Sequence, residues 1–248
     1  MEWDESADSL ILVDNVQLQL GSSSDIRMLH DGTDSKIRST TSDLYITQEA
    51  DDKDIIFQSD DGSGGVETYF FLDGSASSGN PYTTFPDNSL LSFGTGRDFI
   101  INHNGTNTNL GNYTGDLEIV NYANDKDIVF KSDDGSGGVE TYFYLDGSAS
   151  SGDPYTVWPD NSIAAWGTGA DLRIQHTGST ASIFNTTGNL QIINYADDGD
   201  IIFQSDDGSG GVETYFFLDG SLSSGNPFTV FPDDSILTFG NSQDLQIK

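Results

Sequence analysis

The chain has no cysteine, few basic residues and no long hydrophobic run. Without cysteine no disulfide can form, and cysteine usage gives no indication of the redox compartment. Only 9 lysines and arginines oppose 40 acidic residues, and the net charge of −31 disfavours binding to nucleic acid or to an anionic membrane surface. No stretch is long enough to span a membrane, and the first residues lack the basic and apolar regions of a signal peptide.

The hydrophobic content is also low. Hydrophobic residues make up 35% of the chain, against roughly 45–50% apolar residues, glycine included, in globular proteins. A thick core is therefore not expected. The 28 glycines and 15 phenylalanines nevertheless distinguish the chain from a disordered one, which would lack aromatic residues. This composition predicts an all-β protein with many turns.

A twelve-residue stretch, SDDGSGGVETYF, occurs three times at a constant spacing, beginning at Ser59, Ser132 and Ser205. This 73-residue period indicates a repeat protein, in which neighbouring units cover one another's apolar faces. The period predicts repeats at residues 16–88, 89–161 and 162–234, with the end of a preceding repeat at 1–15 and a partial repeat at 235–248. We therefore expect a segment of a longer array.

Each repeat has about seven candidate strands, separated by Gly, Asn and Asp turns. In the second repeat they are residues 89–93, 98–102, a weak strand near Leu110, 116–121, 127–131, 139–145 and 155–158. Alternation places Phe99 with Ile101, and Leu117 with Ile119, on inward faces. The opposite face of the 98–102 strand and its counterparts, with Arg27, Ile100, Arg173 and Gln246, is expected to face mostly water. So few inward side chains per strand favour a thin fibre or solenoid.

The strand VETYFYL is apolar on both faces, because Tyr142 and Tyr144 alternate with Val139, Thr141, Phe143 and Leu145. The corresponding aromatic stripe is Tyr69 with Phe71, Tyr142 with Tyr144, and Tyr215 with Phe217. Aromatic rings of this kind stack on sugars, but large aromatic pairs more commonly bury against a neighbouring strand or chain. The stripe is therefore a candidate glycan-binding surface with a structural alternative.

The three histidines, His30, His103 and His176, occupy one repeat position on the predicted inward face. No serine or cysteine nucleophile motif accompanies them, and three identical environments argue against one active site. The favoured interpretation is a hydrogen-bonded histidine at a strand end. A ring of histidines binding a metal on a three-fold axis is the alternative.

The acidic turns contain a second set of candidate metal ligands, Asp60, Asp61, Asp133, Asp134, Asp206 and Asp207. Oxygen-rich acidic loops suit Ca²⁺ or another divalent ion, although the turns match neither the EF-hand loop nor a glycine–aspartate nonapeptide. A solvated turn is the favoured interpretation. Apart from such an ion, no cofactor is expected.

Several motifs resemble the repeats of marine bacteriophage tail-fibre proteins of the cyanophage type, which read FG-x-x-x-DLQIYHDG, then T-G-x-L-x-I and D-I-x-F-x-S-DDG. The matching stretches are DIRMLHDG at 25–32, DFIINHNG at 98–105, DLRIQHTG at 171–178, TGNLQI at 187–192 and DIIFQSDDG at 200–208. The family's Asp after His is kept as Asp31 but is Asn104 and Thr177 in the later repeats. The resemblance implies an extracellular virion fibre, usually homotrimeric, that reaches toward the host surface.

These observations favour a non-enzymatic, structural segment of a fibre shaft that positions a receptor-binding region. A carbohydrate-binding adhesin that uses the aromatic stripe to contact host glycans is the alternative, followed by a polysaccharide-degrading tailspike. Strand starts inside a repeat, at Asp171, Asn189 and Asp200, are unevenly spaced, and regularity appears only in the 73-residue period. A single-chain solenoid (β-helix) needs similar turns. We therefore predict a parallel, intertwined homotrimer, with the solenoid as its competitor.

Overall fold

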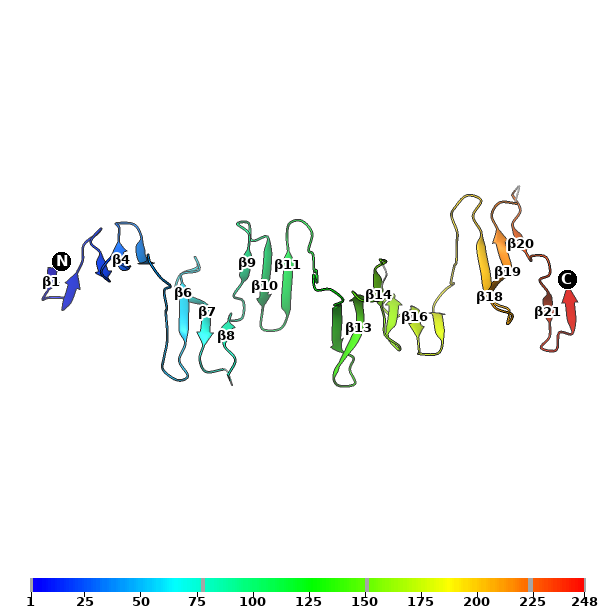
Figure 1. Ribbon diagram of the computed structural model, residues 1–248, viewed down its shortest axis with the longest axis horizontal. Coiled ribbons are helices and arrows are strands. Elements are labelled where there is room, and N and C mark those ends of the chain that lie inside the picture. The colour runs from blue at the N-terminus through cyan, green and yellow to red at the C-terminus, as the bar shows by residue number, and fades with distance from the viewer. Residues whose placement is uncertain (1, 77–78, 150–151, 223–224, 248) are drawn as a thin grey trace. The chain divides into compact units, whose positions relative to one another are not determined.

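The computed structural model of the chain describes residues 2–76, 79–149, 152–222 and 225–247. These residues form strands β1 to β22 and no helix, so the all-β prediction is confirmed. No helix long and apolar enough to cross a membrane occurs among them. The strands make small antiparallel sheets, and every ladder joins strands that follow one another in the sequence (Figure 1). No closed barrel and no stack of solenoid turns is present in this part of the chain.

The chain divides into two units, Met1–Glu118 and Ile119–Lys248. The first unit contains β1 (Glu2–Asp4), β2 (Ser9–Ile11), β3 (Leu18–Leu20), β4 (Ile26–His30), β5 (Ser35–Ser39), β6 (Ile55–Ser59), β7 (Glu67–Asp73), β8 (Tyr82–Thr84), β9 (Leu91–Phe93), β10 (Phe99–His103) and β11 (Thr108–Asn112). The second contains β12 (Ile128–Asp133), β13 (Val139–Asp146), β14 (Tyr155–Val157), β15 (Ile163–Trp166), β16 (Leu172–His176), β17 (Ala181–Asn185), β18 (Ile201–Asp206), β19 (Val212–Asp219), β20 (Phe228–Val230), β21 (Leu237–Phe239) and β22 (Leu245–Ile247).

Two kinds of three-stranded sheet alternate along the sequence. We call β3-β4-β5, β9-β10-β11 and β15-β16-β17 the histidine sheets, because the central strand of each ends in a histidine. The glycine-turn sheets are β6-β7-β8, β12-β13-β14 and β18-β19-β20, in which the first two strands are joined by the DDGSGG turn. Equivalent central strands begin at Ile26, Phe99 and Leu172, so the structure follows the 73-residue period.

The DDGSGG turn depends on its glycines. In the first repeat Gly62, Gly64 and Gly65 have φ values of 87°, 95° and 101°. Residues other than glycine rarely adopt this left-handed region without strain. The three glycines therefore let the chain reverse between β6 and β7 without bending either strand.

A second kind of turn links each glycine-turn sheet to the next histidine sheet. After Pro86 the chain turns at Asn88, which has a φ of 65°, and the Asn88 N–H donates to the carbonyl of His103 at 2.8 Å. The same bond joins Asn161 to His176, also at 2.8 Å. Asparagine tolerates this backbone conformation better than most residues do. Each joint therefore holds the end of a histidine strand.

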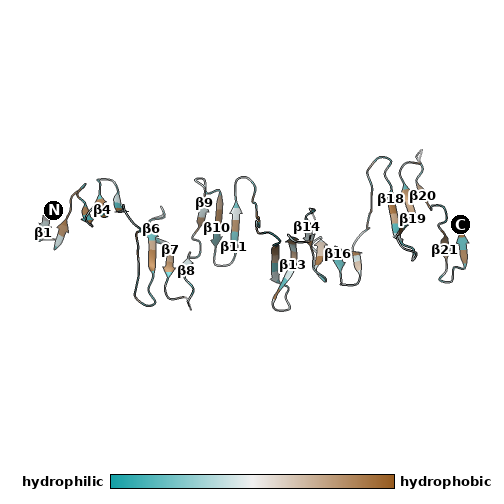
Figure 2. Cartoon of the chain, in the orientation of Figure 1, coloured by the Kyte–Doolittle hydropathy of each residue, from teal (hydrophilic) through white to brown (hydrophobic). Residues whose placement is uncertain are grey.

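No residue in the described part of the chain is fully buried, so there is no hydrophobic core. The accessible surface is 19723 Å². A folded monomer of 26.7 kDa is expected to expose about 10,700 Å². The absence of a thick core, expected from the composition, is confirmed. Large hydrophobic side chains are exposed, among them Ile56 and Ile202 at 54% each, in the strands β6 and β18 that Figure 2 colours as hydrophobic.

The prediction of a mostly water-facing side for the 98–102 strand and its counterparts holds for the exposed Gln246 but is wrong for Arg27, Ile100 and Arg173, which are partly buried. Arg27 and Arg173 are partly buried, whereas Met28 and Ile174 on the opposite face are 43% and 46% exposed. The Arg173 guanidinium lies over the ring of Phe184, 5.6 Å from its centroid. The Arg173 side chain thus covers its cross-strand neighbour Phe184, whereas Met28 and Ile174 remain nearly half-exposed.

The prediction of a strand at residues 116–121 was also wrong. Residues 116–122 carry no strand ladder, and neither do the equivalent residues 43–49 and 189–195. Leu117 and Ile119, predicted to point inward, are 50% and 59% exposed. Alternation identifies a strand-like sequence, but a ladder also needs a partner. We call these three stretches the open segments.

Candidate functional site

Each glycine-turn sheet carries a stack of three aromatic rings on one face. Phe57 stacks on Phe70 at a centroid distance of 4.5 Å, and Phe70 stacks on Phe85 at 5.7 Å. The equivalent stacks are Phe130–Phe143–Trp158 and Phe203–Phe216–Phe231. The ladder places Phe57 directly opposite Phe70, and Phe85 follows β8 immediately before a proline. Offset stacking of this kind stabilises neighbouring aromatics beyond the area they bury.

The predicted aromatic stripe is arranged differently. A β-bulge leaves Tyr142 as an extra residue of β13, because Phe130 pairs with Phe143 while Lys131 pairs with Thr141. The Tyr142 hydroxyl donates to the carbonyl of Asp133 at 3.3 Å. Tyr69 and Tyr215 make the same bond at 3.2 and 3.4 Å. These hydroxyls therefore fix the hairpin, although their rings stay half-exposed.

The second member of each predicted pair is paired across the sheet with mostly aliphatic residues and does not stack on its tyrosine. Phe71 is paired with Ile56 and Thr84, Tyr144 with Val129 and Val157, and Phe217 with Ile202 and Val230. No two of the six predicted stripe residues stack on each other in the described structure. The stacks formed by Phe57, Phe70 and Phe85 were missed, because a bulge shifts the register that brings Phe57 opposite Phe70.

The acidic turns use their carboxylates locally. The Asp60 Oδ1 accepts the Gly62 N–H at 2.6 Å, and the Asp61 Oδ1 accepts both the hydroxyl and the N–H of Ser63 at 2.6 and 2.9 Å. The Ser63 hydroxyl, followed by the Ser63 N–H, holds the pKa of Asp61 below its usual value. The same atoms of Ser136 and Ser209 lower the pKa of Asp134 and of Asp207.

No group of three or more histidine or carboxylate side chains is placed to hold a metal within the described residues of the chain. The six predicted aspartates, Asp60, Asp61, Asp133, Asp134, Asp206 and Asp207, occur two to a turn and bond to main-chain donors. An ion would therefore have to compete with these donors or find further ligands. A metal site in the turns remains a prediction, and the described residues of one chain do not assemble such a site.

Each histidine is hydrogen-bonded at the end of its strand. The His30 Nδ1 lies 2.9 Å from the Asp14 Oδ1, and the His176 Nδ1 lies 2.8 Å from the Asp160 Oδ1. His103 differs, because its Nδ1 contacts the Thr108 hydroxyl at 3.1 Å. The contacts of Asp14 and Asp160 were not predicted, but the turn in which these aspartates lie recurs before every histidine sheet. An exposed carboxylate–histidine hydrogen bond of this kind fixes the orientation of the imidazole ring.

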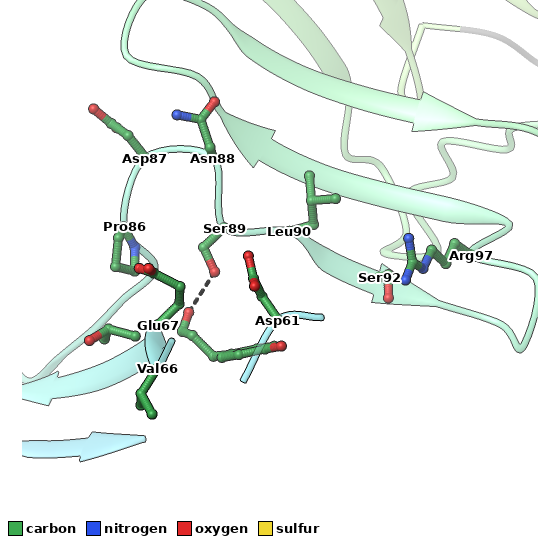
Figure 3. A pocket seen from close by; sticks show the side chains of 12 residues that line it. Asp61, Val66, Glu67, Pro86, Asp87, Asn88, Ser89, Leu90, Ser92 and Arg97 are labelled. Carbon is green, nitrogen blue, oxygen red and sulfur yellow. Dashed lines mark hydrogen bonds between the residues drawn. The ribbon is translucent and has the colours of Figure 1, made fainter. Parts of the chain in front are cut away.

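The first unit contains a polar hollow of about 570 Å³ beside β7, lined by residues including Asp61, Glu67, Tyr69 and Arg97 (Figure 3). The Ser89 hydroxyl donates to the Tyr69 carbonyl at 2.6 Å and closes one side of it. Arg97 has no equivalent arginine, since Ser24, Ala170 and Gln243 occupy its position elsewhere. The arginine of this hollow is therefore specific to one repeat.

Comparisons with known proteins identify no relative. No protein-family model, no curated protein and no solved structure matches this chain. The function must therefore be inferred from the residues and their arrangement.

Proposed function

We propose that the chain is a structural, non-enzymatic segment of a virion fibre, in which three identical chains associate in parallel and hold a receptor-binding region toward the host surface. The tail-fibre resemblance of the DL-x-I-x-H and SDDG motifs supports this assignment. So does the close similarity of the repeats: a single catalytic cleft would require one repeat to differ in its chemistry from the others. Arg97 distinguishes one repeat, but no histidine lines its hollow to activate a hydroxyl such as that of Ser89 or Ser92.

The observation that carries the proposal is the exposed surface. The chain exposes about 9,000 Å² more than a folded monomer of its mass is expected to. Permanent complexes bury roughly 2,000–5,000 Å² or more in total, so association on this scale is characteristic of chains that fold together. Identical partners can cover equivalent apolar faces in every repeat at once, because they share the period.

The measurement that tests the proposal is the mass of the native particle by light scattering coupled to size-exclusion chromatography. A mass three times that of the 26.7 kDa chain is expected at micromolar concentration. A particle of one chain mass that still unfolds cooperatively would contradict the homotrimer and favour the single-chain solenoid. Incubation with host capsule or lipopolysaccharide should release no new reducing ends, since release would identify a tailspike enzyme.

The aromatic stacks favour a second candidate, a fibre that also binds host carbohydrate. The end rings, such as Trp158 at 45% exposure, present a flat apolar surface of the kind that stacks on sugars. A Trp158→Ala variant that keeps its native mass but loses signal on a glycan array would support this function. A wild-type fibre without any array signal would eliminate it.

A further inference from the structure

The open segments have the sequence of a strand but no strand partner. Their first five residues are DLYIT, DLEIV and NLQII, at 43–47, 116–120 and 189–193. Residues two and four of each are apolar: Leu44 with Ile46, Leu117 with Ile119, and Leu190 with Ile192. An alternation that recurs three times at one position indicates a half-buried strand. In the described chain all six side chains are exposed.

The backbone of the open segments is unpaired as well. From Leu117 to Asn121 no main-chain N–H or carbonyl makes a hydrogen bond within the part of the chain that the structure describes. The following turn is well satisfied, since the Ala123 N–H donates to the Asn121 side chain at 3.0 Å. An extended stretch with free donors and acceptors can pair with another strand along its length. The open segments are therefore strands that lack a neighbour.

The repeat period identifies the neighbour. A partner that pairs with all three open segments must offer equivalent sites at the same spacing, and a second copy of this chain in register does so in every repeat. We propose that the open segments pair with identical chains in the assembled particle, with the Leu44–Ile46, Leu117–Ile119 and Leu190–Ile192 side chains turned toward those chains. This inference rests on the homo-oligomer proposed above and assigns the segments through which its chains intertwine.

A hollow beside one open segment fits this arrangement. It has a volume of about 230 Å³ and is lined by residues including Ile119, Val120, Ile128 and Leu145. Its walls thus combine an open segment with the first two strands of a glycine-turn sheet. Such a notch has room for an apolar side chain from another chain, and filling it would cover Ile119.

Hydrogen exchange on the full wild-type chain tests the pairing directly. Amides of Leu117–Asn121 and Leu190–Asn194 should exchange at least about a hundredfold more slowly than those of an unstructured peptide, because strand pairing sequesters them. Amides of the glycine turn, such as Gly64, Gly137 and Gly210, serve as the exposed reference. Exchange of the open segments at the rate of this reference in an associated particle would overturn the inference while leaving the fibre proposal intact.

Charge placed on the two sides of the same segments gives a matched pair of variants. The double variant Ile46→Glu with Ile192→Glu puts two carboxylates on the apolar side, and Tyr45→Glu with Gln191→Glu puts two on the other side. The first should raise the concentration at which half the chains dissociate by at least tenfold, whereas the second should change it less than threefold. Equal effects of the two variants, or none, would contradict the inference. A wild-type chain that is monomeric would instead refute the proposed fibre.

Discussion

The two kinds of sheet differ in how strictly the repeats preserve them. The glycine-turn strand reads VETYFFLD, VETYFYLD and VETYFFLD, with one difference among the three, whereas the central histidine strands read IRMLH, FIINH and LRIQH. In the glycine-turn sheet both faces are apolar, and the tyrosine at the bulge is bonded across the hairpin. In the histidine sheet one face carries residues as different as Arg27, Ile100 and Arg173.

The difference shows which contacts limit sequence variation. A residue in the glycine-turn sheet meets a ring, a bulge or a cross-strand apolar side chain on either face, so a replacement disturbs at least one of them. The variable face of the histidine sheet tolerates either an arginine or an isoleucine at the same position. The glycine-turn sheet is thus expected to carry more of the stability of each repeat.

Removing the central rings of the glycine-turn sheets should destabilise the protein more than any other change proposed below. Phe70→Ala, Phe143→Ala and Phe216→Ala together should cost about 3–5 kcal/mol per site once the faces are covered, because each central ring contacts two others. Natural domains are stable by only about 5–15 kcal/mol, so we expect this variant not to fold. Circular dichroism should show no cooperative thermal transition.

The matched variant in the histidine sheets is Met28→Ala with Ile101→Ala and Ile174→Ala. We expect each substitution to lower the free energy of unfolding by about 2 kcal/mol, the lower end of the range for such truncations, because these side chains have fewer neighbours. A folded protein with a lowered melting temperature is the expected result. If this variant unfolds and the phenylalanine variant survives, the assignment of stability to the glycine-turn sheets is incorrect.

The tyrosine hydroxyls should have the next largest effect. Tyr69→Phe, Tyr142→Phe and Tyr215→Phe remove the bond to the main-chain carbonyl across the hairpin and should cost about 1 kcal/mol per site. Urea unfolding measures the change. The control is Tyr82→Phe with Tyr155→Phe, in the same sheets, where the third repeat already has Phe228. A control as destabilised as the test variant would show that the hydroxyl bond is not the cause.

Acid should weaken the glycine-turn sheets in every repeat, but the histidine sheets mainly in the first, where the Asp34 N–H and Lys36 lower the pKa of Asp31. The N–H groups of Ala76 and Ser75 lower the pKa of Asp73, and the Ser148 and Ala149 N–H groups lower that of Asp146. A pKa lowered by folding contributes stability above the ordinary value of 3.8, and this stability is lost as the pH falls through the folded value. Stability measured in denaturant should therefore decline below about pH 4.

Replacing these aspartates separates their effect from the relief of charge repulsion. Asp73→Asn with Asp146→Asn and Asp219→Asn keeps an acceptor for the N–H groups but removes the titration, so the decline should become shallower. The control is Asp14→Asn with Asp160→Asn, which alters the histidine joints. If the stability of the control declined with falling pH as little as that of the test variant, Asp73, Asp146 and Asp219 would not be the source of the acid sensitivity.

Salt should have the smallest effect. The second repeat carries 11 acidic and 3 basic residues, so neighbouring repeats repel one another and added salt should raise the melting temperature by screening. Calcium chloride and sodium chloride at equal ionic strength should act alike, because the Asp61 Oδ1 already accepts two bonds. An additional rise with millimolar calcium would reveal a metal site in the acidic turns.

Local pattern predicted most strands because it depends on nearby residues. The strand predicted at 98–102 is Phe99–His103, that at 139–145 is Val139–Asp146, and the weak strand near Leu110 is Thr108–Asn112. In each of these cases the partner strand is a few residues away across a turn. Alternation and turn residues together therefore determine the hairpins.

The same pattern failed at residues 116–121, where the described chain supplies no partner strand. Leu117 and Ile119 alternate as Phe99 and Ile101 do, but no adjacent segment is placed to pair with them. The histidine contacts to Asp14 and Asp160 also escaped prediction, because they join residues 16 positions apart through a turn whose geometry the sequence does not specify. The aromatic stacks required the register of the bulge, which only the ladder reveals.

The tight acidic turns have a further consequence for newly made chains. The separate chain exposes sheet edges and apolar side chains that are prone to indiscriminate aggregation. The aspartates at the tip of every glycine turn oppose such aggregation, because like charges repel other chains at a distance. Close, in-register contact elsewhere on the chain still buries apolar surface. The same charge that makes neighbouring repeats repel one another thus gives the separate chain colloidal stability.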